Sequence, residues 1–116
     1  MRKIPPELKE EMANDPYYKK CARSDERNCR GRVTWEHAII YAGRQLNEKW
    51  AILPICEFHH AVNSYQDNGN LNKEKHIWIA LNRAGNANLL RISKAVDYIS
   101  LRERLNAKYK NQTHFN

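Results

Sequence analysis

The chain has 116 residues, of which 41% are hydrophobic and 28% charged, a balance that is ordinary for a globular protein with one modest core. Its 20 lysines and arginines exceed its 13 acidic residues, and the net charge of +7 favours a polyanionic partner such as nucleic acid. No run approaches the roughly 18 apolar residues of a membrane span, and the N-terminus lacks the apolar centre of a secretory signal. We therefore expect one domain over residues 1–116, no membrane partner, and a location in the reducing cytoplasm.

The first predicted element is a short helix over residues 5–14. Proline fits the first turn of a helix, and the acidic residues of this segment favour the positive end of the helix dipole. The Asp-Pro pair at 15–16 ends the helix. The polar stretch 22–28 then predicts a loop between Cys21 and Cys29.

A pair of strands is predicted next. Apolar and polar side chains alternate over residues 33–37, which indicates a strand. The polar segment 41–49 contains a glycine and predicts a surface loop. The apolar run 50–53 predicts the returning strand, which Pro54 stops, and a short helix is expected over residues 56–64.

Two helices are predicted in the C-terminal part. Residues 65–72 contain the turn-forming pair Asn68-Gly69 and predict a loop, which ends at Asn72 as the cap of the first helix. That helix stops at Gly85. A longer helix is predicted from Asn88, because apolar residues recur at helical spacing: Leu89, Ile92, Val96, Ile99, Leu101 and Leu105.

Three cysteines and a histidine form a candidate metal site: Cys21, Cys29, Cys56 and His59. In a reducing compartment, cysteines are more often thiolate ligands or buried thiols than disulfides. A structural zinc ion takes four sulfur or nitrogen ligands, and the C-x-x-H spacing lets one turn present two of them. His60 is the alternative fourth ligand. The alternative to a metal site is three buried thiols with an exposed histidine.

The Glu36-His37 pair, together with His60, is the candidate catalytic site. Hydrolysis of a phosphodiester needs an activated water, a cation at the scissile phosphate and stabilisation of the leaving oxygen. A neutral imidazole can accept the proton of the water near pH 7, while a carboxylate and a second imidazole can hold one divalent ion. Adjacent residues of a strand point to opposite sides, so Glu36 and His37 need a local bend or a metal ion at the flank of the strand.

Residues 21–64 resemble the HNH endonucleases of the ββα-metal superfamily, and the small, zinc-containing phage-type members most of all. These proteins carry an acidic residue followed by histidine at the end of a first strand, then a loop, a second strand and a helix that opens with a C-x-x-C-H-like sequence. The resemblance implies that His37 is the general base. It implies that Glu36 and His60 bind a catalytic divalent ion, Mg²⁺ or Mn²⁺, with Zn²⁺ or Ni²⁺ as alternatives. It also implies that a structural zinc ion is held by Cys21, Cys29, Cys56 and His59.

Two positions depart from the family pattern. Glu36 stands where aspartate is usual, and Ala51 stands where the middle asparagine of the family is expected, with Asn47 nearby but out of register. These departures keep open a second interpretation from another class, a noncatalytic zinc-containing module that binds DNA or protein on the same scaffold.

We therefore expect an α+β fold with a small ββα-metal (HNH) core over about residues 21–64, built around zinc. An N-terminal helix and two C-terminal helices flank this core, the latter in an extension over about residues 72–110. The expected function is metal-dependent hydrolysis of DNA phosphodiester bonds, in the host cytoplasm if the protein is phage-encoded. Four polar side chains near the motif are the predicted nucleic-acid contacts: Arg32, Arg44, Lys49 and Asn63.

Overall fold

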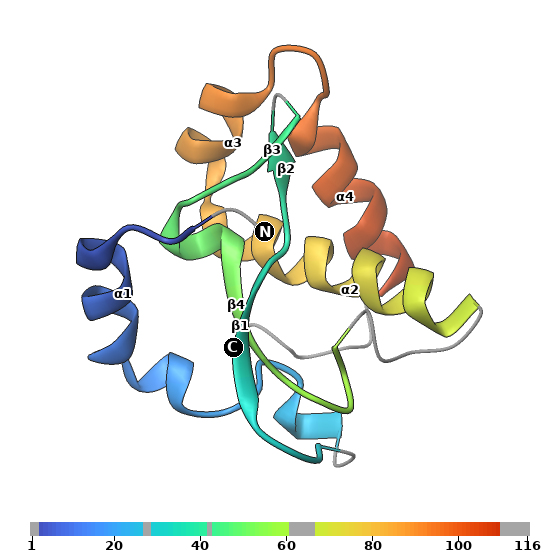
Figure 1. Ribbon diagram of the computed structural model, residues 1–116. Helices are drawn as coiled ribbons and strands as arrows, with labels where there is room; N and C mark the ends of the chain where they lie inside the picture. The colour runs from blue at the N-terminus through green and yellow to red at the C-terminus, as the bar shows by residue number, and fades with distance from the viewer. Residues whose placement is uncertain (1–2, 27–28, 42, 61–66, 110–116) are drawn as a thin grey trace.

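The computed structural model describes residues 3–26, 29–41, 43–60 and 67–109, which form a small α+β fold with four α-helices and short antiparallel strands (Figure 1). In chain order these are α1 (Pro6–Ala13), β1 (Val33–His37), β2 (Ile40–Tyr41), β3 (Arg44–Gln45), β4 (Ile52–Cys56), α2 (Asp67–Ala84), α3 (Asn86–Ile92) and α4 (Tyr98–Lys108). Single turns of 3₁₀ helix lie at Pro16–Lys19, Ser24–Glu26 and Lys49–Ala51. The α+β class and the N-terminal helix are confirmed. Within the described ranges, no helix has both the length and the apolar character to cross a membrane.

The central feature is the antiparallel pair of β1 and β4, in which Val33 lies opposite Cys56 and His37 lies opposite Ile52. This confirms the two predicted strands, but the returning strand begins later than predicted and continues through Pro54. The prediction that this proline stops the strand is wrong. A proline is tolerated where a strand has a neighbour on one edge only, and the sheet of the described residues has just these two strands.

The strand β4 is buried on both faces and separates two apolar clusters. Leu53 and Ile55 pack with residues of α2, α3 and α4. Ile52, on the other face, packs with Met12 and Tyr18 from the N-terminal part. Because side chains alternate along a strand, the register of this one strand decides which residues face each cluster.

The loop predicted over residues 41–49 contains a second, very short hairpin. β2 pairs with β3, with Ile40 opposite Gln45 and Tyr41 opposite Arg44. Gly43 lies in the turn with φ of +77°, a conformation that favours glycine. Sequence alternation is not visible over two-residue strands, so the pattern gave no sign of this hairpin.

The C-terminal part has three helices rather than the predicted two. The first, α2, begins at Asp67, so the loop and the cap predicted over residues 65–72 are wrong from that position onward. α2 and α3 meet at Gly85, whose φ of +80° confirms the predicted stop. The chain turns there and continues as a separate helix.

The long helix predicted from Asn88 is divided into α3 and α4. Ser93 donates a hydrogen bond to the carbonyl of Leu89 and accepts one from the backbone N–H of Tyr98. Asp97 caps α4 by accepting from the N–H of Ser100. These side-chain contacts satisfy backbone groups at the break, and Val96 is exposed there instead of lying in the predicted apolar stripe.

The helix predicted over residues 56–64 is wrong where the structure describes this segment. Cys56 is the last residue of β4, and residues 57–59 form a turn. Residues 61–64 lie outside the described residues. The two strands of the expected ββα unit are therefore present, while the HNH fold as such is not confirmed.

A buried polar network joins the N-terminal part to β4 and α2. The Tyr18 hydroxyl lies 2.8 Å from the carbonyl oxygen of Ile52 and 2.5 Å from that of Lys49, and it accepts a hydrogen bond of 2.9 Å from Nη1 of Arg83. The Arg83 guanidinium lies 4.1 Å from the centre of the Tyr17 ring, a cation–π distance. One hydroxyl thus connects three segments that are far apart in sequence.

We predict that Tyr18→Phe lowers the free energy of unfolding by about 1–3 kcal/mol, because it leaves buried polar partners without the hydroxyl. Urea denaturation followed by circular dichroism measures this loss. Tyr98→Phe is the matched control, since within the described part of the chain the Tyr98 hydroxyl makes one hydrogen bond, to the carbonyl of Ile40 at an exposed position. An equal loss in both variants would contradict the role assigned to Tyr18.

Candidate metal centre and adjoining pocket

The predicted cysteine–histidine set is brought together in space. The ligand atoms of Cys21, Cys29, Cys56 and His59 all lie within 4.8 Å of one another. His59 faces the three sulfurs with Nδ1, at 3.8 Å from Cys21, 3.7 Å from Cys29 and 3.3 Å from Cys56. The open choice between His59 and His60 is therefore resolved in favour of His59 as the member of this cluster.

The cluster has dimensions that suit zinc. A tetrahedral zinc ion with bonds of about 2.3 Å to sulfur and about 2.0–2.1 Å to nitrogen holds a sulfur and a nitrogen ligand about 3.6 Å apart. The three observed sulfur–nitrogen distances, 3.3 to 3.8 Å, lie around this value. Three thiols and one imidazole are also the donor types that structural zinc takes. The four side chains form a possible zinc site.

Backbone contacts bring the ligand loops to one place. The N–H of Ala22 donates a hydrogen bond of 2.7 Å to the carbonyl of Pro54, which holds the first loop against β4. The N–H of Phe58 donates to the carbonyl of Arg30 at 3.2 Å, which joins the second loop to the turn after Cys56. Gly31 has φ of +78°, and a Cβ there would lie 2.7 Å from the Glu57 carboxyl group, so the close approach needs glycine.

His59 is suited to bind a metal. Burial, and after it the positive charge of Arg23, lowers the pKa of His59 to about 4, so the imidazole is neutral at pH 7. Its outer nitrogen, Nε2, lies 3.9 Å from the Glu26 carboxylate. Burial alone would raise the pKa of Glu26, but Arg23 and Lys75 outweigh it and lower that pKa to about 2. This carboxylate places a negative charge beside the outer nitrogen of the imidazole.

The thiols differ in how readily they ionise without a metal. Burial would raise the pKa of Cys56, but backbone N–H donors of His59 and Arg30 lower it overall. Burial raises the pKa of Cys21. Burial also raises the pKa of Cys29 to about 12, and there the neighbouring sulfurs of Cys56 and Cys21 add to the effect. Three thiols packed together disfavour three thiolates, and a bound cation removes that penalty.

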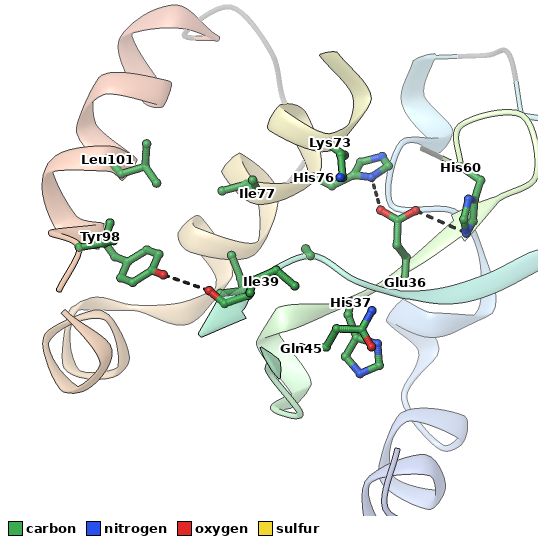
Figure 2. Close-up of a pocket in the computed structure, with 13 residues that line it drawn as sticks. Glu36, His37, Ile39, Gln45, His60, Lys73, His76, Ile77, Tyr98 and Leu101 are labelled. Atoms are coloured by element: carbon green, nitrogen blue, oxygen red, sulfur yellow. Dashed lines mark hydrogen bonds and ion pairs between the residues drawn. The ribbon is translucent and has the colours of Figure 1, made fainter. Parts of the chain in front are cut away.

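A second polar group lies on the α2 side of β1 (Figure 2). Glu36 stands between two histidines, with Oε2 at 2.5 Å from Nδ1 of His76 and Oε1 at 3.6 Å from Nε2 of His60. The Glu36 side chain is 13% exposed, so its carboxylate is mostly removed from water. The structure thus brings together the predicted residues Glu36 and His60 and adds His76 from α2. We call these three side chains the Glu36 group.

His76 is the functional candidate that the sequence prediction missed. Its side chain is 1% exposed, and among the described residues its Nε2 has no hydrogen-bond partner. Because a carboxylate only accepts, Nδ1 carries the proton and donates to Glu36. A signal was present, since His76 lies four residues before the buried Ala80 and therefore on the same face of α2.

His37 lies apart from Glu36. Alternation along β1 directs Glu36 toward α2 and His37 toward the opposite side, as Figure 2 shows. The His37 Nε2 lies 2.6 Å from Oδ1 of Asn47, whose amide nitrogen donates to the carbonyl of Lys3. Nε2 is therefore the protonated nitrogen, and Nδ1 is buried with no partner in the described part of the chain. The local bend that would turn both side chains to one site is not present.

A pocket of about 610 Å³ begins at the Glu36 group and extends between the end of β1, α2 and the start of α4. One end is polar, with Lys73 beside the two histidines. The other end is apolar and includes Ile77 and Leu101. The volume falls in the range of about 300–1,000 Å³ that small-molecule sites occupy.

Three of the four predicted nucleic-acid contacts lie outside the pocket. Arg32 and Arg44 are exposed, and neither lines the pocket. Lys49 makes ion pairs with Asp15 at 2.8 Å and Glu11 at 3.4 Å, on the side of α1. Asn63 lies outside the described residues. The lysine that lines the pocket is Lys73, which was not predicted.

We predict that the purified protein binds one zinc ion through His59 and not through His60. His59→Ala should lose the ion, and chelation should abolish the cooperative unfolding transition, because binding at such a site contributes about 10–16 kcal/mol that is largely folding free energy. Zinc content measured by mass spectrometry, with thermal melts followed by circular dichroism, tests both points.

His60→Ala is the matched control, since it removes the adjacent imidazole and leaves the cluster complete. Full zinc content in His59→Ala, or an unchanged melt after chelation, would show that the cluster is a set of packed thiols.

Comparisons with known proteins do not assign this chain to a family. No protein-family model, curated protein or solved structure matches it. The resemblance to HNH endonucleases stays a prediction from the sequence.

Proposed function

We propose that the protein is a metal-dependent endonuclease that hydrolyses DNA phosphodiester bonds at the Glu36 group. The observation that carries this proposal is a mostly buried carboxylate held between two imidazoles at the polar end of an open pocket. Placing a carboxylate in such surroundings costs solvation free energy. Clusters of this kind are typical of sites that bind ions or move protons.

Glu36 and His60 are the proposed ligands of the catalytic divalent ion, Mg²⁺ or Mn²⁺. Their oxygen and nitrogen lie 3.6 Å apart, a separation that one ion can span. His76 is the proposed positioning residue, because its Nδ1 hydrogen bond holds the carboxylate in place. When bound, the ion polarises the phosphate and lowers the pKa of a bound water. Lys73, at the same end of the pocket, is placed to contact a phosphate oxygen.

The role of His37 as general base is also part of the proposal. Its Nδ1, which is buried and has no hydrogen-bond partner among the described residues, carries the lone pair that a base needs. In the described conformation the ring faces Asn47 instead of Glu36, so a reaction that uses His37 requires the ring to leave that contact. Asn47, not the position of Ala51, supplies the asparagine that contacts this histidine.

The Cys21–Cys29–Cys56–His59 cluster is proposed to hold a structural zinc ion. It joins two loops and the end of β4. Small domains often depend on such a metal because their cores are modest.

A second candidate function is a noncatalytic zinc-containing module that binds DNA or protein. The observation in its favour is the orientation of His37, which faces away from Glu36 and connects to the N-terminal segment through Asn47. In this interpretation the Glu36–His76 contact serves to hold α2 against β1.

We predict that the purified protein nicks supercoiled plasmid when Mg²⁺ or Mn²⁺ is added. Glu36→Gln should reduce the rate by about 100-fold or more, because the amide lacks the charge that holds the ion. The rate of nicking on agarose gels is the measurement, and unchanged zinc content with an unchanged melt shows that the variant is folded. Arg91→Gln is a control, since this exposed residue pairs with Glu48 outside the pocket.

The absence of metal-dependent nicking by the parent protein, with plasmid still retarded on a gel, would support the noncatalytic module.

We predict that His37→Ala loses nicking by about 100-fold or more, in the range expected for removal of a general base. Asn47→Ala should retain nicking, because it frees the imidazole without removing it. Both variants lose the same hydrogen bond, so they separate a catalytic role from a structural one. Equal losses of thermal stability and activity in the two variants would mean that His37 serves only to position the N-terminal segment.

A further inference from the structure

We propose that the apolar end of the pocket binds the base of an unpaired nucleotide, so that the protein selects single-stranded or locally unpaired DNA. This inference rests on the proposed function, because it names the substrate class of the same site.

The pocket changes from polar to apolar along its length, as Figure 2 shows. The polar end carries Glu36, His60, Lys73 and His76. The apolar end carries Ile39, Ile40, Ile77, Val96, Tyr98 and Leu101. A nucleotide has the same division, with an anionic phosphate at one end and a flat base with apolar faces at the other. A nucleotide whose phosphate lies near Glu36 therefore has its base directed toward an apolar wall.

The rim of the apolar end is exposed to water. Ile40 is 57% exposed and Val96 is 48% exposed, and they are two of the four large hydrophobic side chains that stand out in the described part of the surface. Both line this pocket, although they come from segments far apart in sequence. Exposed apolar side chains that converge on one concave site indicate a ligand that covers them.

Tyr98 gives this wall an aromatic ring in a fixed position. Its hydroxyl donates a hydrogen bond of 3.2 Å to the carbonyl oxygen of Ile40, so the ring is tied to β2 across the pocket. Aromatic and aliphatic side chains beside a basic group are the usual surface for an unstacked base, because every base has an apolar face.

Duplex DNA does not complement this pocket. In a duplex the base faces are stacked inside the helix and only the base edges are exposed in the grooves. A duplex phosphate near Glu36 would leave the apolar end of the pocket empty. An unpaired base enters at a lower cost of unpairing and unstacking than a base in a duplex. The shape of the site thus favours a strand whose bases are free.

The test compares three probes that differ in their bases but carry the same phosphate chemistry. A short fluorescein-labelled oligonucleotide is offered as a single strand, as a duplex with its complement, and as an abasic strand of equal length. Binding to the zinc-loaded protein is followed by fluorescence anisotropy without added Mg²⁺ or Mn²⁺. We expect the single strand to bind about tenfold or more tightly than the abasic strand, since base stacking is lost in the latter, and also more tightly than the duplex.

Ile40→Ser with Val96→Ser removes the exposed apolar rim without changing charge. We expect this double variant to bind the single strand and the abasic strand about equally, with its affinity for the abasic strand unchanged. Leu90→Ser is the matched control, because Leu90 is 64% exposed and does not line the pocket. It should keep the full preference for bases.

Equal binding of the base-containing and abasic strands by the parent protein would overturn the inference, as would a preference for duplex or an unchanged preference in the double variant. The outcome is separate from that of the proposed function. A preference for base-containing strands without nicking would support the base-binding pocket and contradict the proposed nuclease activity. Nicking without such a preference would support the nuclease activity and contradict the base-binding pocket.

Discussion

The antiparallel register of β1 and β4 places both candidate centres. At one end, Val33 lies opposite Cys56, so the strand pair ends beside the cysteine–histidine cluster. Near the other end, Glu36 lies opposite Leu53, and the two share the face that packs against α2. A slip of one residue would turn every side chain to the other face. It would bury Glu36 against the N-terminal cluster and remove it from His76.

The parts of the molecule that were predictable from sequence are those set by neighbours in the chain. The alternation over residues 33–37 indicated β1, and the C-x-x-H spacing identified Cys56 and His59 as a pair of potential ligands. The contact of Glu36 with His76 joins residues 40 positions apart. It depends on how α2 packs across the sheet, and periodicity shows which face of a helix is buried without showing against what.

The errors in the helix boundaries predicted for the C-terminal part come from local hydrogen-bonding and turn signals, not from long-range contacts. Apolar residues recur at helical spacing from Leu89 onward, which predicted one continuous helix. Instead, the side chains of Ser93 and Asp97 accept hydrogen bonds from backbone N–H groups, and the helix is interrupted at these residues. Near Asp67 the opposite occurred, because α2 runs through the turn-forming pair Asn68-Gly69. The sequence pattern alone does not show which turn signals end a helix and which are included in one.

His59 and His60 are adjacent in the chain, yet one faces the three cysteines and the other faces Glu36. Consecutive Cα atoms are separated by about 3.8 Å, so a single peptide unit is the only covalent spacer between the two centres. The chain cannot lengthen or shorten at this point without displacing a donor from one of them. An ion that fixed the His59 imidazole would therefore also constrain the position from which His60 reaches the Glu36 carboxylate.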